Sequence, residues 1–552
     1  QIKDYYSNKV LIDNIEIKRE ERVYVDYALG KYGTYNFVVE LDPDDDQVFD
    51  DEYTKLAHSQ KVSVDFNLTY SAGNYHRKNV YVSPTGNYYG NGSKESPFDL
   101  ETAIKNAVPG QTIILTEGRY LFNEIGQTLK IDRGIDGTAE APIRLVADPE
   151  AKTRPVIDFG GYGFGFTHGG NYWYFGGFDV TGSAGGQKGM QISGNYNTLV
   201  DIHAYRNGNT GIQISRYSGT DYTIEHWPSY NLILNCDSYY NADPGYEDAD
   251  GFAAKLTCGP GNVFDGCVAY NNADDGWDLY AKVETGPIGS VTIKNCVAYR
   301  NGYLEDGRAG GNGNGFKMGG SSISGHHVLM NSISFNNLTK GIDSNSCPDI
   351  EVYNCISFNN GNYNVAFYTN DVANTAFKAS GIISIRTENL STGENLKGKG
   401  TQVESDYMNE SNYYWVGGVC QNSKGAKLTT DIFVSLVFDF EAGVGRNADG
   451  TINLGDFLKI KEGSVPAGVG TTGASTPSPK LEFVEDLEHN YSESWYNVDP
   501  NYHWHACDCG DKSHVEEHTF EYVIDKEPTE TEPGYKHNEC TVCGYKKAQI
   551  EI

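Results

Sequence analysis

A short motif repeats along the middle of the chain, and this repetition limits the folds that the chain can adopt. Each copy alternates small or apolar residues with an aromatic residue and ends in asparagine. The copies, which recur at intervals of 23 to 36 residues, are Asn235–Asn241, Gly266–Asn272, Asn295–Asn301, Asn331–Asn337 and Asn354–Asn360, with a weaker one at Asp201–Asn207. Such alternation followed by a turn-favouring residue predicts a short strand and a turn in each copy.

Similar strands separated by insertions of variable length predict a β-solenoid. One coil cannot bury its apolar face alone, so successive coils must stack. Stacking places Cys236, Cys267, Cys296 and Cys355 in the core as small hydrophobic side chains. It also predicts that the repeated asparagines form a ladder of side-chain amides. A β-sandwich or a propeller is the alternative, but the fixed short motif without a repeated Trp-Asp pair favours the solenoid.

The regions that flank the repeat have a different character and predict additional parts. Alternation in Val62–Tyr70 indicates a small β-sandwich-like module over residues 1–77. The solenoid is expected to occupy residues 78–470. A stretch rich in Thr, Ser and Pro then opens a linker over 471–502. A Cys/His-rich module over 503–552 completes this sequence.

The charge of the chain excludes two classes of partner. There are 43 Lys and Arg residues against 74 Asp and Glu, which gives a net charge of −31. Nucleic acids and anionic membranes are bound by basic surfaces, so neither is an expected partner. No apolar stretch reaches the ~18 residues of a membrane span. The sequence opens at Gln1 on polar residues, which indicates a mature or trimmed chain without its signal peptide.

Acidic residues cluster after two neighbouring copies of the motif. Asp250 belongs to the first cluster, and Asp274, Asp275 and Asp278 belong to the second. Because each cluster occupies a similar place in its repeat, stacking should bring the carboxylates together on one face. Convergent carboxylate oxygens are ligands that Ca²⁺ prefers, and without a cation they would repel one another. The alternative interpretation is a pair of acidic turns in an acidic protein.

A glycine-rich segment one coil later contains Lys317. Glycine allows a backbone to pass close to a ligand. A lysine on the face of the acidic clusters would feel the field of a bound cation, which lowers the pKa of the amine and lets it act as a base. The alternative is a surface lysine that caps a turn.

The C-terminal module contains four clustered cysteines. Cys507 and Cys509 form a Cys-x-Cys pair, and Cys540 and Cys543 form a Cys-x-x-Cys pair about thirty residues later. Four such residues can hold Zn²⁺ tetrahedrally. Two disulfides are the alternative in an exported protein.

The residues 264–280, with Asp-Ala-Asp-Gly-Phe before them and Gly-Asn-Gly-Phe-Lys after them, resemble the pectate lyases of polysaccharide lyase family 9. The resemblance extends from about Asn79 to about Gly468. It implies an all-β fold with a right-handed parallel β-helix, a calcium site and a lysine base. Residue by residue, the calcium ligands fall on Asp250, Asp274, Asp275 and Asp278, and the base falls on Lys317.

The resemblance implies a secreted, monomeric bacterial enzyme that cleaves polygalacturonate by β-elimination with Ca²⁺ as cofactor. A rhamnogalacturonan lyase is the alternative within the same chemistry. A hydrolase is a weaker one, suggested by Gly325-His326-His327, and a non-catalytic carbohydrate-binding β-helix is another. Arg308, near the base, is a candidate substrate clamp or the partner in a loop salt bridge. Lys255, in the coil of Asp250, is a candidate substrate ligand and the second choice of base.

Overall fold

The structure, a computed structural model, describes residues 77–552 with short gaps, and only four strands before them. The gaps are residue 89 and residues 371–373, 388–392, 484–489, 498–500 and 508–511. The chain divides into two compact units. The smaller contains residues 1–77, 87–98 and 487–552, and the larger contains residues 78–86 and 99–486.

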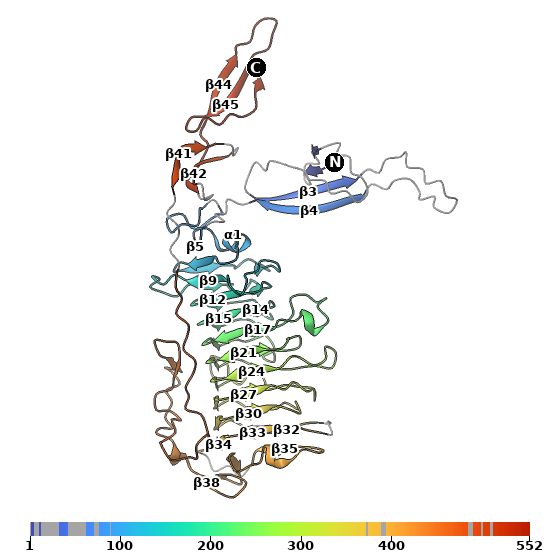
Figure 1. The fold of residues 1–552 in the computed structure, drawn as a ribbon, viewed down its shortest axis with the longest axis vertical. Coiled ribbons are helices and arrows are strands. Elements are labelled where there is room, and N and C mark those ends of the chain that lie inside the picture. The colour runs from blue at the N-terminus through green and yellow to red at the C-terminus, as the bar shows by residue number, and fades with distance from the viewer. Residues whose placement is uncertain are drawn as a thin grey trace, which may run out of the picture. The chain divides into compact units, whose positions relative to one another are not determined.

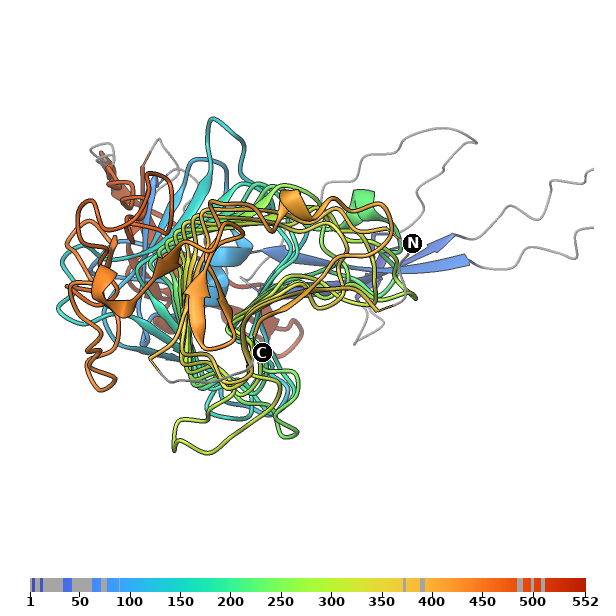
Figure 2. The same ribbon diagram turned by 90° about the horizontal axis from the view of Figure 1, so that it is seen from below.

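Three long parallel sheets form the larger unit (Figure 1). Each coil contributes one strand to each sheet, and the next coil adds the next strand in parallel register. Figure 2 looks along this stack, and the successive coils superpose in it. The unit is therefore a parallel β-helix, which confirms the predicted solenoid.

The three sheets follow one another around each coil. Sheet 1 contains β5 (Asn79–Val82), β6 (Thr112–Leu115), β9 (Ile143–Ala147), β12 (Trp173–Gly176), β15 (Thr198–Val200), β18 (Leu232–Leu234), β21 (Asn262–Asp265), β24 (Val291–Lys294), β27 (Val328–Met330), β30 (Glu351–Tyr353) and β33 (Lys378–Ser380). Sheet 2 contains β7 (Arg119–Leu121), β10 (Val156–Asp158), β13 (Asp179–Thr181), β16 (His203–Tyr205), β19 (Asp237–Tyr239), β22 (Val268–Tyr270), β25 (Val297–Tyr299), β28 (Ile333–Phe335), β31 (Ile356–Phe358) and β34 (Ile383–Ile385). Sheet 3 contains β8 (Leu129–Ile131), β11 (Phe166–His168), β14 (Met190–Ile192), β17 (Ile212–Ile214), β20 (Phe252–Ala254), β23 (Trp277–Asp278), β26 (Phe316–Lys317), β29 (Lys340–Asp343), β32 (Tyr363–Tyr368) and β35 (Asn395–Lys397).

A continuous ladder of buried asparagines runs along the turn after sheet 2. At each step a side-chain Nδ2 donates to the Oδ1 of the next asparagine over 2.9–3.0 Å. Its members are Asn207, Asn241, Asn272, Asn301, Asn337 and Asn360. These amides also satisfy buried backbone groups at the turn, as the repeat predicts. Cys236, Cys267, Cys296 and Cys355 are buried free thiols, which confirms their role as core side chains.

A glycine precedes each neighbouring strand of sheet 3 and packs against this ladder. A Cβ at Gly276 would lie 2.8 Å from Asn301 Nδ2, and one at Gly315 would lie 2.9 Å from Asn337 Nδ2. A larger residue would therefore displace the ladder or the strand. The glycines fix where each strand of sheet 3 begins.

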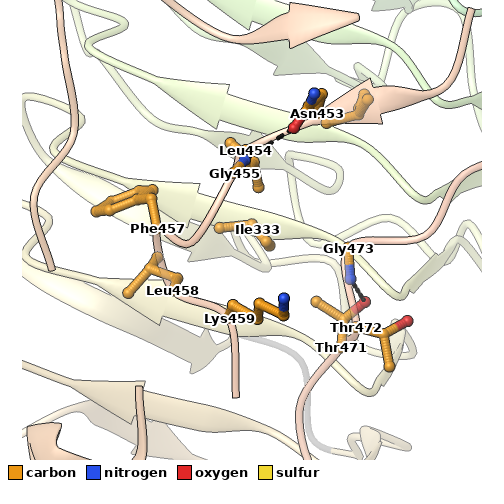
Figure 3. A pocket seen from close by; sticks show the side chains of 11 residues that line it. Ile333, Asn453, Leu454, Gly455, Phe457, Leu458, Lys459, Thr471, Thr472 and Gly473 are labelled. Atoms are coloured by element: carbon orange, nitrogen blue, oxygen red, sulfur yellow. Dashed lines mark hydrogen bonds between the residues drawn. The ribbon is translucent and has the colours of Figure 1, made fainter. Parts of the chain in front are cut away.

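The last part of the larger unit returns along the outer face of sheet 2, where Tyr270, Tyr299 and Phe335 stack at 4.9–5.0 Å. We call residues 404–483 the return segment. It contains η2 (Glu404–Asp406), β36 (Tyr414–Val416), β37 (Val419–Gln421), β38 (Lys427–Leu428), η3 (Thr430–Ile432), β39 (Gly445–Arg446) and β40 (Ile452–Asn453). Between it and β28 lies a pocket of about 170 Å³, lined by Ile333, Phe457 and Thr471 among others (Figure 3). No carboxylate lines this pocket, so it is a packing feature of the return segment.

The start of the predicted linker is bound to the β-helix. Asn235 Nδ2 donates to the Thr476 carbonyl over 2.9 Å, and Thr476 Oγ1 donates to Asp265 Oδ2 over 2.6 Å. Strand β41 (Tyr491–Tyr496) also lies within the range 471–502 that composition assigned to a linker. Composition did not reveal these contacts, because Thr476 makes them through hydrogen bonds of its carbonyl and its hydroxyl.

The remaining elements cap the β-helix or belong to the smaller unit. Helix α1 (Leu100–Lys105) starts at Asp99, whose side chain accepts from the Thr102 N–H, and buries Leu100, Ala103 and Ile104. Sheet order β2-β1-β3-β4 joins β1 (Ile2–Asp4), β2 (Val10–Ile12), β3 (Gly33–Leu41) and β4 (Val62–Tyr70). One further antiparallel sheet contains β41, β42 (Tyr502–Cys507) and β43 (Lys512–Glu517). Another contains β44 (Phe520–Lys526), β45 (Tyr535–Cys540) and β46 (Ile550–Glu551). The single 3₁₀ turn η1 (Ile224–His226) lies in the loop between β17 and β18. Within the described residues, every helix is too short or too polar to cross a bilayer.

Candidate active site

Neighbouring strands of sheet 3 place the candidate residues side by side. Asp278 in β23 is paired in parallel register with Lys317 in β26, and Lys317 is paired with Asp343 in β29. Because side chains alternate across a strand, the preceding residues point the other way. There Trp277 stacks on Phe252 and on Phe316 inside the core, each at 4.9 Å. The aromatic stack thus holds the Asp and Lys side chains on the outer face.

The turns before these strands bring three more carboxylates to the same place. Single ligand oxygens of Asp250, Asp274 and Asp275 all lie within 4.8 Å of one another. Asp250 precedes β20, whereas Asp274 and Asp275 precede β23. All three are buried, and the predicted convergence of these residues is therefore present in the structure. Asp278 joins them indirectly, through the lysines described below.

The glycine-rich loop before β26 orients two of these carboxylates. Asn312 N–H donates to Asp274 Oδ1 over 2.7 Å. Asn314 binds Asp275 Oδ1 twice, through its backbone N–H over 2.7 Å and its side-chain Nδ2 over 2.8 Å. Each bond leaves the second oxygen of the carboxylate available to another partner. The loop therefore acts on the site through its backbone as well as its side chains.

Two lysines lie against the carboxylates. Lys255 Nζ is 2.6 Å from Asp250 Oδ2 and 3.1 Å from Asp278 Oδ2. Lys317 Nζ is 3.0 Å from Asp275 Oδ2 and 3.5 Å from Asp278 Oδ2. Asp278 thus contacts both ammonium groups. Lys255, which the sequence suggested as a substrate ligand or second base, is mainly buried in this ion-pair network.

Burial and mutual repulsion shift the titration of this group of residues. Burial raises the pKa of Asp250 to about 7, although the charge of Lys255 opposes the rise. Burial and the charge of Asp275 raise the pKa of Asp274 to about 9. Burial acts to lower the pKa of Lys317, but Asp275 and Asp278 outweigh it and hold that pKa well above its usual range. Without a further cation, Lys317 therefore keeps its proton.

The donor set suits a divalent cation. If all four carboxylates are ionised, the two ammonium groups leave two negative charges uncompensated in a buried place, which is why burial and repulsion raise the pKa of Asp250 and of Asp274. In addition, Asp275 Oδ2 is buried and accepts no hydrogen bond, since Lys317 approaches it in ion-pair range but outside hydrogen-bond geometry. A hard cation with oxygen ligands would satisfy both the charge and this oxygen. The residues that would hold it are Asp250, Asp274 and Asp275.

The remaining predicted residues lie elsewhere or in other roles. Arg308 is exposed and its Nε donates to Asp306 Oδ2 over 2.8 Å, which is the loop salt bridge considered from the sequence. His327 is buried on the turn before β27 of sheet 1, where it accepts from the Val291 N–H over 3.2 Å. Burial lowers the pKa of His327 to about 4. It is a structural residue outside the carboxylate group, whereas His326 is exposed, with its Nδ1 3.1 Å from Asp349 Oδ2.

The structure also adds residues that the sequence did not single out. Lys317 Nζ lies 5.7 Å from the ring centre of Tyr280, and the Tyr280 hydroxyl is 2.9 Å from Ser321 Oγ. Next along sheet 3, Lys340 Nζ pairs with the buried Asp343 over 2.6 Å. Burial, reinforced by the charge of Lys255, lowers the pKa of Lys188. None of these positions repeats from coil to coil, so the motif contained no signal for them.

In the C-terminal module the structure brings two of the four predicted cysteines together. Cys540 and Cys543 share a group with two histidines, whereas Cys507 is not part of it. No disulfide joins Cys540 and Cys543. Cys509 lies in the gap 508–511, outside the described residues.

Comparisons with known proteins identify the family of the chain. The family model described as the Pel9A-like right-handed β-helix region matches residues 80–376. The chain is 42% identical over 427 residues to pectate lyase L of Paenibacillus polymyxa (strain SC2), and the alignment covers 76% of this chain and 88% of the relative. It is also 42% identical over 435 residues to pectate lyase L of Thermoclostridium stercorarium, covering 78% of this chain. The chain spans only 33% of that longer relative.

Solved structures give the same assignment. The crystal structure of pectate lyase Pel9A superposes with a TM-score of 0.57 at 31% identity, covering 74% of this chain and 94% of that one. A rhamnogalacturonan lyase superposes with a TM-score of 0.56 at 22% identity, covering 70% and 97%, which is a likeness of fold. With its right-handed parallel β-helix, the chain belongs to the pectate lyases of polysaccharide lyase family 9.

Proposed function

We propose that this chain is a Ca²⁺-dependent lyase that cleaves polygalacturonate by β-elimination and releases unsaturated oligogalacturonates. The observation that carries the proposal is the meeting of Asp250, Asp274 and Asp275 with Lys317 on one face of sheet 3. A non-catalytic β-helix would have no need for an amine beside a carboxylate cage. The relatives named pectate lyase L support the choice of substrate.

Ca²⁺, held by Asp250, Asp274 and Asp275 and balanced by Asp278, would neutralise the galacturonate carboxylate and stabilise the charge that develops at C5. The chain itself supplies the other cationic groups near the substrate. Lys188, Lys255 and Lys340 lie around the same face and can contact neighbouring uronate carboxylates once substrate displaces their present partners. A cation bound by Asp250, Asp274 and Asp275 can bridge to the uronate carboxylates, which answers how a protein with a net charge of −31 binds a polyanion.

Lys317 is the proposed base. Its neutral amine takes the C5 proton, the electron pair of that C–H bond forms the C4–C5 double bond, and the bond from C4 to the glycosidic oxygen breaks. The leaving oxygen takes a proton from solvent. Asp275 and Asp278 hold Lys317 in place and oppose its deprotonation, so neutralising these carboxylates is what frees the amine.

We also propose that the enzyme acts outside the cell, since its polymeric substrate cannot cross a membrane to reach it. No described feature of the structure calls for a partner chain, and a monomer fits this action on a long polymer.

The test follows ultraviolet absorbance of the unsaturated product with polygalacturonate, with and without Ca²⁺, and with rhamnogalacturonan as the second substrate. We expect absorbance to rise only with polygalacturonate and Ca²⁺. Asp275→Asn should raise the Ca²⁺ concentration needed for half-maximal rate, whereas the exposed control Asp306→Asn should not. New reducing ends without absorbance would indicate hydrolysis. Tight binding without either product would indicate a carbohydrate-binding protein, and full activity in excess chelator would refute the calcium role.

A further inference from the structure

Four side chains with soft metal-binding atoms converge in the C-terminal module. His503 lies in β42, His518 lies between β43 and β44, and Cys540 ends β45 with Cys543 in the turn after it. One ligand atom of each of these side chains lies within 4.8 Å of the other three. They come from two different antiparallel sheets, so the group bridges those sheets.

The distances within the group match tetrahedral coordination of zinc. His503 Nδ1 and His518 Nδ1 face each other at 3.2 Å, Cys543 Sγ is 3.2 Å from His518 Nδ1, and Cys540 Sγ is 4.0 Å from His503 Nδ1. Zinc with ordinary bond lengths separates two nitrogen ligands by ~3.3 Å and a nitrogen from a sulfur by ~3.6 Å. Two imidazole nitrogens this close without a metal can share one hydrogen bond at most.

The turn around the two cysteines has the shape that a metal-bound thiolate requires. Gly544 has a φ of 75°, and its N–H donates to the Cys540 carbonyl over 3.0 Å, which folds the chain back after β45. The backbone N–H groups of Val542 and Cys543 are thereby directed at the Cys540 sulfur. Donors directed at a sulfur stabilise its negative charge, and the thiolate is the form that binds metal.

The histidines are held in the orientation that presents Nδ1 to the group. His503 is fully buried, and its ring packs edge-on against Trp495 at 4.4 Å. Its other nitrogen, Nε2, lies 3.8 Å from Glu516 Oε2, where a carboxylate would orient a metal-bound imidazole. The ring of His518 stacks on Tyr545 at 4.8 Å.

The module also has very little hydrophobic core to hold it together. Its described hydrophobic cluster consists of Tyr502 and Trp504, with Ala506 and Val515 packed against them. On β44, Tyr522 and Ile524 are more than half exposed. Small domains of this kind are usually stabilised by disulfides or a metal, and Cys540 and Cys543 form no disulfide here.

We propose that the C-terminal module binds one structural Zn²⁺ through His503, His518, Cys540 and Cys543, and that this ion joins its two sheets. The site is closed by four protein ligands, which is the arrangement of structural rather than catalytic zinc. This ligand set replaces Cys507 and Cys509, which the sequence spacing had offered, with two histidines.

The test measures zinc in the full chain, purified without chelator and with Ca²⁺ in excess to occupy the carboxylates. We expect one zinc per chain in the wild type, and Co²⁺ in its place should give the visible absorption of a thiolate-bound tetrahedral ion. Cys540→Ser with Cys543→Ser should lower zinc at least tenfold. The matched controls Cys507→Ser and His537→Gln, in the same module but outside the group, should keep the wild-type amount.

A second measurement uses the wild-type chain, so its result does not depend on whether a variant folds. Native thiol titration before and after extraction of zinc should reveal two additional reactive thiols, and re-addition of zinc should protect them again. The proposal is wrong if the wild type holds no zinc, or if Cys507→Ser loses as much zinc as the double variant. It is also wrong if zinc extraction leaves the number of reactive thiols unchanged.

Discussion

Lys317 and Asp278 are direct neighbours in the parallel register of β26 and β23, with Nζ 3.5 Å from Oδ2. Two adjacent strands of one sheet therefore fix the distance between the proposed base and Asp278, a carboxylate beside the proposed calcium ligands. A β-helix keeps adjacent strands about 4.8 Å apart, so neither residue can move without the sheet.

Removal of the amine should abolish turnover. Lys317→Ala should lower kcat by roughly 10²–10⁴-fold, the usual contribution of a general base, with little change in substrate affinity. Lys317→Arg should rescue weakly, because a guanidinium holds its proton more tightly. Steady-state kinetics with saturating Ca²⁺ measure both values, and Lys294→Ala on sheet 1 is the control. If Lys317→Ala turns over normally, Lys255→Ala becomes the variant to examine.

Activity should rise with pH into the alkaline range. Neighbouring carboxylates hold the pKa of Lys317 above its usual value, so the fraction of neutral base grows with pH. Calcium binding also improves as Asp250 and Asp274 ionise, with pKa values of about 7 and about 9. Profiles of kcat at saturating Ca²⁺ isolate the lysine from this second effect. A rate that falls between neutral and alkaline pH under these conditions would contradict the assignment of the base.

Calcium should stabilise the protein more at high pH than at low pH. Folding raises the pKa of Asp250 and Asp274. Their favourable contribution to the free energy of unfolding is therefore complete below about pH 4 and is lost as pH rises toward about 9. Bound Ca²⁺ favours the ionised carboxylates and should offset that loss. Thermal unfolding with Ca²⁺ and with chelator should therefore diverge as pH rises from 5 to 9. Asp274→Asn should reduce the divergence, and equal curves at all pH values would count against the site.

Interruption of the asparagine ladder should destabilise the β-helix. Asn360 is fully buried and its Oδ1 accepts from Asn337 Nδ2 over 2.9 Å, so Asn360→Ala leaves buried donors without partners. Each such group costs roughly 1–3 kcal/mol, so we expect a loss of at least that size in the free energy of unfolding. Asn362→Ala, two residues away and exposed, should change stability by less than about 0.5 kcal/mol. Denaturant unfolding compares the two variants.

The sequence predicted sheet 2 and the ladder because one motif contains both the alternating strand and the asparagine. A second amide ladder through Asn197, Asn231 and Asn262 was missed, since its flanking residues differ from coil to coil. Stacking also predicted the convergence of the carboxylates. It could not predict that Asn314 would bind Asp275 from a loop 39 residues later, because that contact depends on how the loop folds back.

In the C-terminal module, regular spacing in the sequence and proximity in the structure point to different residues. The two cysteine pairs have regular spacing and dominated the interpretation, whereas the approach of His503 and His518 to Cys540 and Cys543 depends on how the sheets fold.

The contact between each glycine of sheet 3 and its asparagine also determines where this protein can accept new sequence. An insertion that shifts a glycine of sheet 3 away from its asparagine in the next coil would break the stacking of the coils. A loop that begins after an asparagine and ends before the next glycine can instead vary in length. The interval from Asn301 to Gly315 is such a loop, and it ends against Asp274 and Asp275. Substrate preference in this architecture can therefore diverge through loop length while the reacting groups keep their positions.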